Sequence, residues 1–182
     1  MGATGIALLG AGTVGTSVAR QLLSEPALLG SRAGAPCELR HIVVRDLHRA
    51  RHAAIPASLL TTDASSALDD PAVGVVVEVI GGLDPAGPLV ERALRSGRTV
   101  VTANKALLAE RGAEFAALAR SSGAGLLFEA AAGAGLPIVG LLRHTLQGDV
   151  IQGIDAIING TTNFILGQMA AGVAYPQALA AA

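Results

Sequence analysis

The chain has 182 residues, enough for one full domain or for one domain and the beginning of a second. Hydrophobic residues make up 51% and aromatic residues only 2%, so we expect a core of Ala, Val, Leu and Ile. A net charge of −1 gives no general attraction to nucleic acid or anionic lipid, and no uninterrupted apolar run reaches the roughly 20 residues of a membrane-spanning helix. The single cysteine, Cys37, excludes an internal disulfide, and no basic leader precedes the first apolar stretch, which fits a cytoplasmic protein.

The first predicted strand, over 5–9, leads directly into a glycine-rich turn. Behind the turn, apolar residues recur at helical spacing over 14–23. A G-x-G-x-x-G motif between a strand and a helix, here Gly10, Gly12 and Gly15, is typical of a dinucleotide-binding site. The first glycine allows a tight turn, the second lets a pyrophosphate approach the backbone, and the third lets the helix pack closely on the strand.

Further elements are predicted as far as Glu129. Residues 26–36 contain two prolines and two glycines and are expected to form a surface loop. Strands are predicted over 39–44, over 73–80, from Thr99 to Lys105 and over 125–129, with helices over 86–96 and from Lys105 to about Arg120. Strands that alternate with helices indicate an α/β fold with a doubly wound parallel sheet.

The pattern changes after Glu129. The next predicted elements are a small-residue loop, a helix from Pro137 to about Leu146, a strand over 150–158, the polar run 159–163 and a helix from Phe164. We place a boundary near Gly148, between a dinucleotide-binding domain over 1–148 and the beginning of a second domain over 149–182. The last residues supply neither a helix cap nor a polar stop, so we expect the second domain to be incomplete.

Lys105, the only lysine in the chain, is an unusual choice for its position. Asn104 is a good N-cap, because its side chain can accept a hydrogen bond from a free amide of the first helical turn. A cation in that turn faces the positive end of the helix dipole, so helix stability disfavours it. Ligands of open α/β sheets bind at the carboxyl ends of the strands. Lys105 is therefore predicted to contact a ligand; a solvated surface lysine is the alternative.

The second predicted strand ends at Arg45 and Asp46, where a dinucleotide fold contacts the adenosine ribose. An acid there accepts from the ribose 2′-hydroxyl and favours NAD, whereas an arginine holds the 2′-phosphate of NADP. The basic stretch 48–52 follows, so the local charge favours NADP held by Arg45, with NAD still open; a solvated basic helix face is the alternative for the later arginines. Two histidines in that stretch stand four apart, but the arginines between them repel a divalent cation, and we predict no zinc site.

Two later segments are candidates for binding ligands. Glu129 ends an apolar strand before a loop of small residues, so its carboxylate and the loop carbonyls could hold a weakly bound hard cation. Equally, Glu129 could cap a neighbouring helix or pair with Arg143. The polar run 159–163 could hydrogen-bond a small polar substrate, or form an ordinary turn that caps the next helix.

Taken together, these segments resemble the homoserine dehydrogenase family. The resemblance rests on 10–15, 77–82, 100–109, 128–138 and 159–166. It covers nearly the whole chain in order, and the segments around the lysine and Asn-Gly-Thr-Thr-Asn are specific in combination. It implies a Rossmann-type cofactor domain and an α+β substrate and dimerisation domain. The family reduces the small molecule aspartate 4-semialdehyde to homoserine with NADH or NADPH, for threonine, methionine and isoleucine biosynthesis, and is usually a homodimer.

The resemblance also implies roles for individual residues. The cofactor would contact Gly10, Gly12, Thr13, Val14, Gly15 and Arg45. Lys105 would lie between the nicotinamide and the substrate, and Gly160 and Thr161 would touch the substrate. The family's sodium site would correspond to Glu129 and the carbonyls of Ala132, Ala134 and Leu136.

Negative charge builds on the aldehyde oxygen as hydride arrives, and a cation or proton donor there lowers the barrier. Lys105 can supply field and orientation. The lysine usually assigned as proton donor in the family lies in a later Gly-x-Asp-x-x-x-Lys segment that this sequence does not contain. We therefore expect the chain to bind cofactor and to reduce the aldehyde poorly.

Three other functions compete with this one. A sugar dehydrogenase is disfavoured because its catalytic lysine usually precedes a proline, whereas Ala106 stands here. Aspartate-semialdehyde dehydrogenase needs a cysteine nucleophile, and Cys37 lies too early in the chain. A non-enzymatic NAD(P)-sensing domain would need the glycine turn but has no use for Lys105 or the run 159–163.

Overall fold

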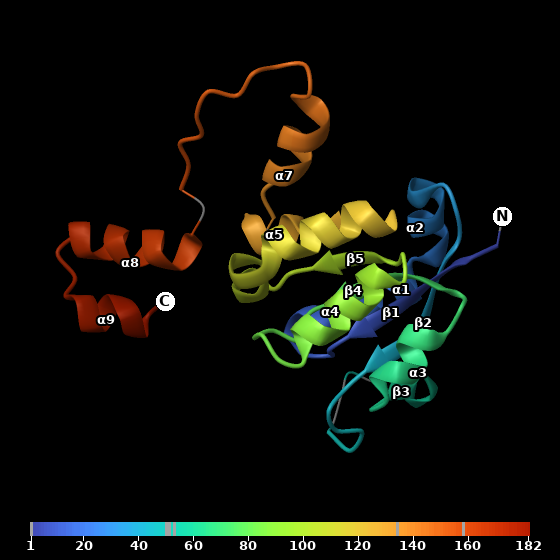
Figure 1. The fold of residues 1–182 in the computed structure, drawn as a ribbon. Helices are drawn as coiled ribbons and strands as arrows, with labels where there is room; N and C mark the ends of the chain where they lie inside the picture. The colour runs from blue at the N-terminus through green and yellow to red at the C-terminus, as the bar shows by residue number, and fades with distance from the viewer. Residues whose placement is uncertain (1, 50–51, 53, 134, 158) are drawn as a thin grey trace.

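Six parallel strands form one sheet in the computed structural model, which describes residues 2–49, 52, 54–133, 135–157 and 159–182 (Figure 1). The strands are β1 (Thr4–Leu9), β2 (Cys37–Val43), β3 (Leu60–Thr61), β4 (Val73–Glu78), β5 (Thr99–Thr102) and β6 (Leu126–Leu127). Their order is β3-β2-β1-β4-β5-β6, and every neighbouring pair is parallel. This is the order of a doubly wound dinucleotide-binding sheet, with its switch point between β1 and β4, and it confirms the predicted fold.

Helices cover both faces of the sheet. The helices of the described residues, in chain order, are α1 (Thr13–Ser24), α2 (Pro26–Ala33), η1 (Ala57–Leu59), α3 (Ala64–Asp69), α4 (Ala86–Arg95), α5 (Lys105–Ser122), α6 (Glu129–Ala132), α7 (Ile138–Gly140), the π-helical η2 (Leu141–Thr145), α8 (Gly160–Ala170) and α9 (Tyr175–Ala180). Buried residues of α3, α4 and α5 pack on one face, and α1 packs on the other. Strand β1 is buried on both faces, which explains why its sequence is a continuous apolar run.

The segment 26–36 contains a helix, α2, where we predicted a loop. Pro26 is the first residue of this helix, a position at which proline's missing amide and fixed φ are tolerated. Gly34 ends it in the left-handed conformation, with a φ of 73°. The proline and the glycine therefore mark the two ends of a helix. The short elements β3 and α3 were also missing from the sequence prediction.

The strand predicted over 150–158 is absent from the described part of that segment, 150–157. Val150 is 87% exposed and Ile157 is 74% exposed. A strand needs a neighbour for its amides and carbonyls, and none of the described strands pairs with these residues. Beyond them, α8 packs against α9, and the pair stands apart from the sheet (Figure 1). None of the described helices is long and apolar enough to cross a bilayer.

Candidate functional site

The turn between β1 and α1 lies at the carboxyl edge of the sheet, and the chain's own packing explains two of its glycines. Gly10 has a φ of 105°, and a Cβ there would lie 2.9 Å from the carbonyl oxygen of Val79. A Cβ on Gly15 would lie 2.1 Å from the carbonyl oxygen of Gly10. A side chain on Gly10 would therefore clash with the backbone that follows β4, and a side chain on Gly15 would clash with the backbone of the turn itself.

Gly12 differs from these two glycines. A Cβ on Gly12 would meet no atom of the described chain within 4 Å, so folding gives no reason for a glycine here. Gly12 is the N-cap of α1, no side chain caps the helix, and its first turn carries no acidic residue. Thr13 and Val14 in that turn are exposed. Free amides and the positive end of the helix dipole thus face open space, an arrangement that favours an anionic ligand close to the backbone.

The end of β2 provides an exposed arginine. Arg45 follows the strand by two residues and makes no hydrogen bond or ion pair within the described part of the chain. Asp46 accepts a hydrogen bond from the backbone amide of His48 at 2.8 Å, so its carboxylate already holds the local turn. Arg51, from the same basic stretch, lies outside the described residues.

Lys105 is the first residue of α5, as predicted. The side chain of Asn104 caps the helix, accepting from the amide of Leu107 at 3.1 Å. Lys105 is exposed and makes no hydrogen bond or ion pair with other described residues. Its ammonium therefore stands at the carboxyl edge of β5, and no carboxylate among the described residues neutralises it.

A buried carboxylate lies beneath this edge. Glu78, the last residue of β4, is 0% exposed. The hydroxyl of Thr102 donates to its Oε2 at 2.5 Å, and the amides of Ile80 and Gly81 donate to its Oε1 at 2.8 and 3.3 Å. Glu78 is not among the site residues predicted from the sequence. The available signal was an acid in a run of valines, since carboxylates are almost never fully buried without partners.

Asn104 extends the hydrogen-bond network around Glu78. Its Nδ2 donates to the carbonyl of Gly82 at 2.7 Å and, more weakly, to Glu78 Oε1 at 3.4 Å. Its backbone amide donates to the hydroxyl of Thr102 at 3.0 Å. The network therefore joins the loop after β4 to the residue that caps the helix of Lys105.

Glu129 caps a helix, one of the two alternatives considered for it. Its carboxylate accepts from the amides of Val139 and Gly140 at 2.8 and 2.7 Å, in the first turn of α7. Burial opposes ionisation of this carboxyl, but hydrogen bonds from three amides of α7 outweigh it, and the net effect is a lowered pKa. Arg143 does not pair with Glu129; its Nη1 donates to the carbonyl of Leu126 at 3.2 Å.

Of the cation ligands that the resemblance implies, Glu129, Ala132 and Leu136 are among the residues that the structure describes. The carbonyl of Leu136 accepts from the amide of Ile138 at 2.9 Å, and Ala134 lies outside the described residues. The carboxylate of Glu129 is already satisfied by amides, so the geometry explains this acid without an ion. Each of its oxygens has a second lone pair, however, and a helix cap is compatible with a cation ligand.

The polar run 159–163 begins α8. Asn159 is the N-cap and accepts from the amide of Thr162 at 2.9 Å, while Gly160 and Thr161 are exposed in the first turn. No hydrogen bond or ion pair between described residues joins this run to Lys105 or to the glycine turn. The structure thus brings together Gly10 to Gly15, Arg45 and Lys105 at one edge of the sheet, and leaves Gly160 and Thr161 on a separate helix pair.

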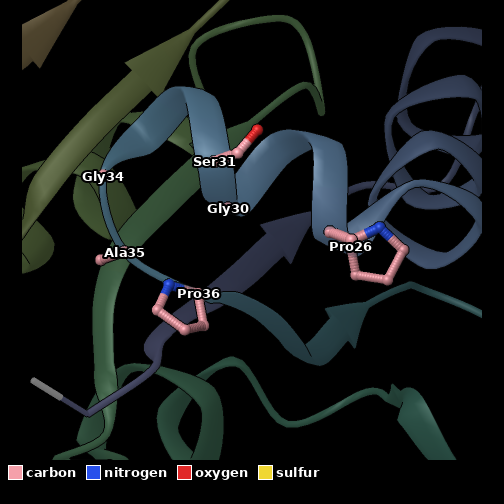
Figure 2. Close-up of a pocket in the computed structure, with 7 residues that line it drawn as sticks. Pro26, Gly30, Ser31, Gly34, Ala35 and Pro36 are labelled. Carbon is pink, nitrogen blue, oxygen red and sulfur yellow. The ribbon is translucent and has the colours of Figure 1, made fainter.

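Two surface hollows lie elsewhere. The hollow in Figure 2, about 450 Å³, is lined by small residues of α2 and the segment that follows it. It lies at the amino end of the sheet, because Pro36 accepts from the amide of Thr4 at the start of β1. A second hollow, about 520 Å³, is lined by the later part of α1 with His52 and Ala54. The candidate site therefore rests on the glycine turn and the charges at the carboxyl edge.

Two family models match this chain, and together they cover most of its length. A family model described as the NAD-binding domain of homoserine dehydrogenase matches residues 10–129, and a second model described as homoserine dehydrogenase matches residues 137–182. The first match contains the glycine turn, Arg45, Glu78 and Lys105, and the second contains Gly160 and Thr161.

Individual relatives show the same similarity. Homoserine dehydrogenase of Corynebacterium glutamicum is 47% identical over 181 residues, which are 99% of this chain and 40% of the relative. The crystal structure of the Thiobacillus denitrificans enzyme superposes with a TM-score of 0.88 at 41% identity, over 97% of this chain and 41% of that one. A hyperthermophilic archaeal homoserine dehydrogenase in complex with NADPH has a TM-score of 0.78 at 27% identity, over 97% and 59%. The chain thus spans about 40% of the length of the curated relatives it matches.

Proposed function

The chain belongs to the homoserine dehydrogenase family, and from that premise we propose that it supplies the NAD(P)-binding part of an enzyme that reduces aspartate 4-semialdehyde to homoserine. The observation that carries the proposal is Gly12. This glycine stands before an uncapped helix N-terminus at the switch point of the sheet, and packing does not explain it. A cofactor pyrophosphate close to the backbone gives the physical reason, with Gly10, Thr13, Val14 and Gly15 forming the turn around it.

The cofactor proposed is NADP. Arg45 is exposed, free of partners in the described chain and placed where this fold contacts the adenosine ribose. A ribose 2′-phosphate would give it a charge-assisted hydrogen-bond partner. Asp46, the next residue, is an acid that could accept from the ribose 2′-hydroxyl, so NAD is the alternative cofactor. The NADPH bound to the archaeal relative is in line with this preference.

Lys105 is proposed to stabilise charge during reduction. The bound cofactor supplies the hydride that adds to the aldehyde carbon. Lys105 then holds a positive charge where the aldehyde oxygen becomes negative, and its ammonium needs no reorganisation because no carboxylate in the described chain pairs with it. The dipole of α5, whose first residue is Lys105, adds a field of the same sign.

The segment beyond Gly148 is proposed to begin the substrate and dimerisation domain. The sheet and its covering helices lie before this point, and α8 with α9 forms a separate pair after it. Gly160 and Thr161 would contact the substrate from the first turn of α8. The proposal includes a homodimeric, cytoplasmic parent enzyme. Cleavage by dilute protease between Gly148 and Asn159, with 1–148 surviving, is the outcome expected for this boundary.

A sodium ion near Glu129 also remains part of the proposal. The carboxylate and the carbonyls of Ala132 and Leu136 are oxygen ligands suited to a hard cation, and the helix cap leaves lone pairs free on the carboxylate. Addition of NaCl should then raise the melting temperature more than choline chloride at the same ionic strength. An equal response to the two salts would contradict the cation site.

The proposed function is tested by titrating NADPH and NADH into the chain and following nucleotide fluorescence, with and without homoserine. We expect tighter binding of NADPH. We also expect a homoserine effect on binding that the Lys105→Ala variant loses. If homoserine does not change the affinity of the wild-type chain for the cofactor, the result would instead support a nucleotide-sensing module. If neither cofactor binds, the proposal is refuted.

A further inference from the structure

Glu78 is a buried acid that pairs with no cation among the described residues. Within the described part of the chain, its hydrogen-bond donors are neutral: two backbone amides, one hydroxyl and one carboxamide. Burial of a carboxylate is unfavourable even when hydrogen bonds satisfy it, and its neighbours along β4 are valines. A valine here would serve the core at least as well. Core packing therefore does not explain why position 78 is an acid.

The position of Glu78 supplies that reason. In the sheet register, Glu78 lies beside Leu9 of β1 and beside Thr102 of β5, at the carboxyl edge. A doubly wound sheet consists of two mononucleotide-binding halves. The glycine turn and Arg45 belong to the half built from β1, β2 and β3, so the adenosine end is expected there. The nicotinamide end falls to the half built from β4, β5 and β6, where Glu78 lies.

The network around Glu78 holds two segments of that second half. One is the loop after β4, where Gly81 and Gly82 adopt φ values of 82° and 72° and side chains would be strained. The other is the start of α5, because Thr102 holds the amide of Asn104 and Asn104 caps the helix. Asn104 also closes the network by donating to the carbonyl of Gly82. Both segments reach the carboxyl edge, and the second carries Lys105.

From this arrangement we propose that Glu78 is a positioning residue for the nicotinamide end of the cofactor, acting through Thr102 and Asn104. This inference rests on the proposed function. Glu78 does not touch the cofactor; it fixes the loop of Gly81 and Gly82 and the first turn of α5 in the arrangement that receives the nicotinamide. Its loss should weaken contacts to that end alone, because the adenosine end is held by a separate half of the sheet.

The test compares the binding of two ligands to the wild-type chain and to four variants. The ligands are NADPH and 2′-phospho-ADP-ribose, which carries the adenosine end but no nicotinamide. In Glu78→Gln and in Thr102→Val, we expect NADPH to bind about tenfold more weakly, the scale of one lost hydrogen bond to a charged group, with unchanged affinity for 2′-phospho-ADP-ribose. Thr99→Val, at the opposite end of β5, is the matched control and should change neither affinity. Thr102→Ser keeps the hydroxyl and should restore binding of NADPH.

The outcomes separate the two proposals. If the variants lose affinity equally for both ligands, or for neither ligand, the positioning role is overturned while the proposed function stays intact. Failure of the wild-type chain to bind either ligand would overturn the proposed function and, with it, this inference. Thr102→Val preserves the branched shape of the side chain, so it carries the test if Glu78→Gln does not fold.

Discussion

Gly15 packs directly over Gly10: a methyl group on Gly15 would lie 2.1 Å from the carbonyl oxygen of Gly10. A methyl group on Gly12 would have no atom of the described residues within 4 Å. The absence of a side chain at these two positions of one motif therefore has two different physical explanations. Gly15 is required by contact between the helix and the turn, whereas Gly12 borders a space that none of the described residues fills.

This difference predicts opposite phenotypes for two alanine variants. Gly15→Ala should lower the free energy of unfolding by about 1–3 kcal/mol, the usual range for overpacking. Gly12→Ala should lower it by no more than about 1 kcal/mol, as expected for alanine at an N-cap, yet weaken cofactor binding at least about tenfold. Urea unfolding and NADPH titration of the two variants check both parts. Equal affinity of Gly12→Ala and wild type would show that no ligand uses the open space.

Arg45 is predicted to select between the two cofactors. Replacement by alanine removes a charge-assisted contact to the 2′-phosphate, so NADPH should bind about tenfold or more weakly while NADH is unaffected. The control is Arg32→Ala, an exposed arginine in the last turn of α2 at the other end of β2, which should change neither affinity. Parallel loss of NADH and NADPH binding in Arg45→Ala would rule out a role in discrimination.

Asp70 joins the end of α3 to β2, at the edge of the sheet remote from the candidate site. Its Oδ2 accepts from Arg40 Nε at 2.8 Å and lies 2.9 Å from His41 Nε2, and its Oδ1 accepts from the amide of Ala72 at 2.9 Å. The hydrogen bond from Arg40, then those from His41 and Ala72, hold the pKa of the Asp70 carboxyl well below its usual range.

Because the folded-state pKa of Asp70 is depressed, ionised Asp70 stabilises the fold above the unfolded pKa of about 4, and this stabilisation is lost as the pH falls through the lower folded value. Asp70→Asn should therefore have a lower melting temperature than wild type at pH 7, and the difference should shrink towards pH 3. Circular dichroism melts across this range provide the measurement. Asp69→Asn, which breaks only an exposed pair with Arg92, should change stability little. If the melting temperatures of Asp70→Asn and wild type differ by the same amount at every pH, the stabilising role of ionised Asp70 is contradicted.

Glu129 is predicted to stabilise α7 through its cap. Glu129→Gln keeps one acceptor oxygen for the amides of Val139 and Gly140 and loses the charge that favours a helix N-terminus. The variant should melt at a lower temperature than wild type at neutral pH, and protection of these two amides from hydrogen exchange should fall. The matched control is Glu110→Gln, an exposed acid of α5. Unchanged protection in Glu129→Gln would show that the cap does not hold the helix.

Local patterns in the sequence were sufficient for much of this molecule. The apolar strand, the glycine turn and the helix over 4–24 lie within a stretch short enough for periodicity and backbone sterics to define it. Asn104 and Lys105 were placed correctly because an N-cap acts within one helical turn. The same local reasoning misread 26–36, where Pro26 and Gly34 begin and end a helix.

Contacts between distant positions could not be predicted in this way. Glu78 meets Thr102 and Asn104 from 24 and 26 residues away, so only the pairing of β4 with β5 brings the network together. The pKa of the Glu129 carboxyl is lowered, against the effect of burial, by hydrogen bonds from amides that include those ten and eleven residues later in the chain. The strand predicted over 150–158 requires a neighbour, which sequence periodicity cannot supply. The sequence by itself determined the glycine turn after β1 and the cap and lysine that begin α5, because these are properties of single turns. The tertiary structure decided which buried groups hold the start of α5 and the loop after β4 in place, because those groups come from separate strands.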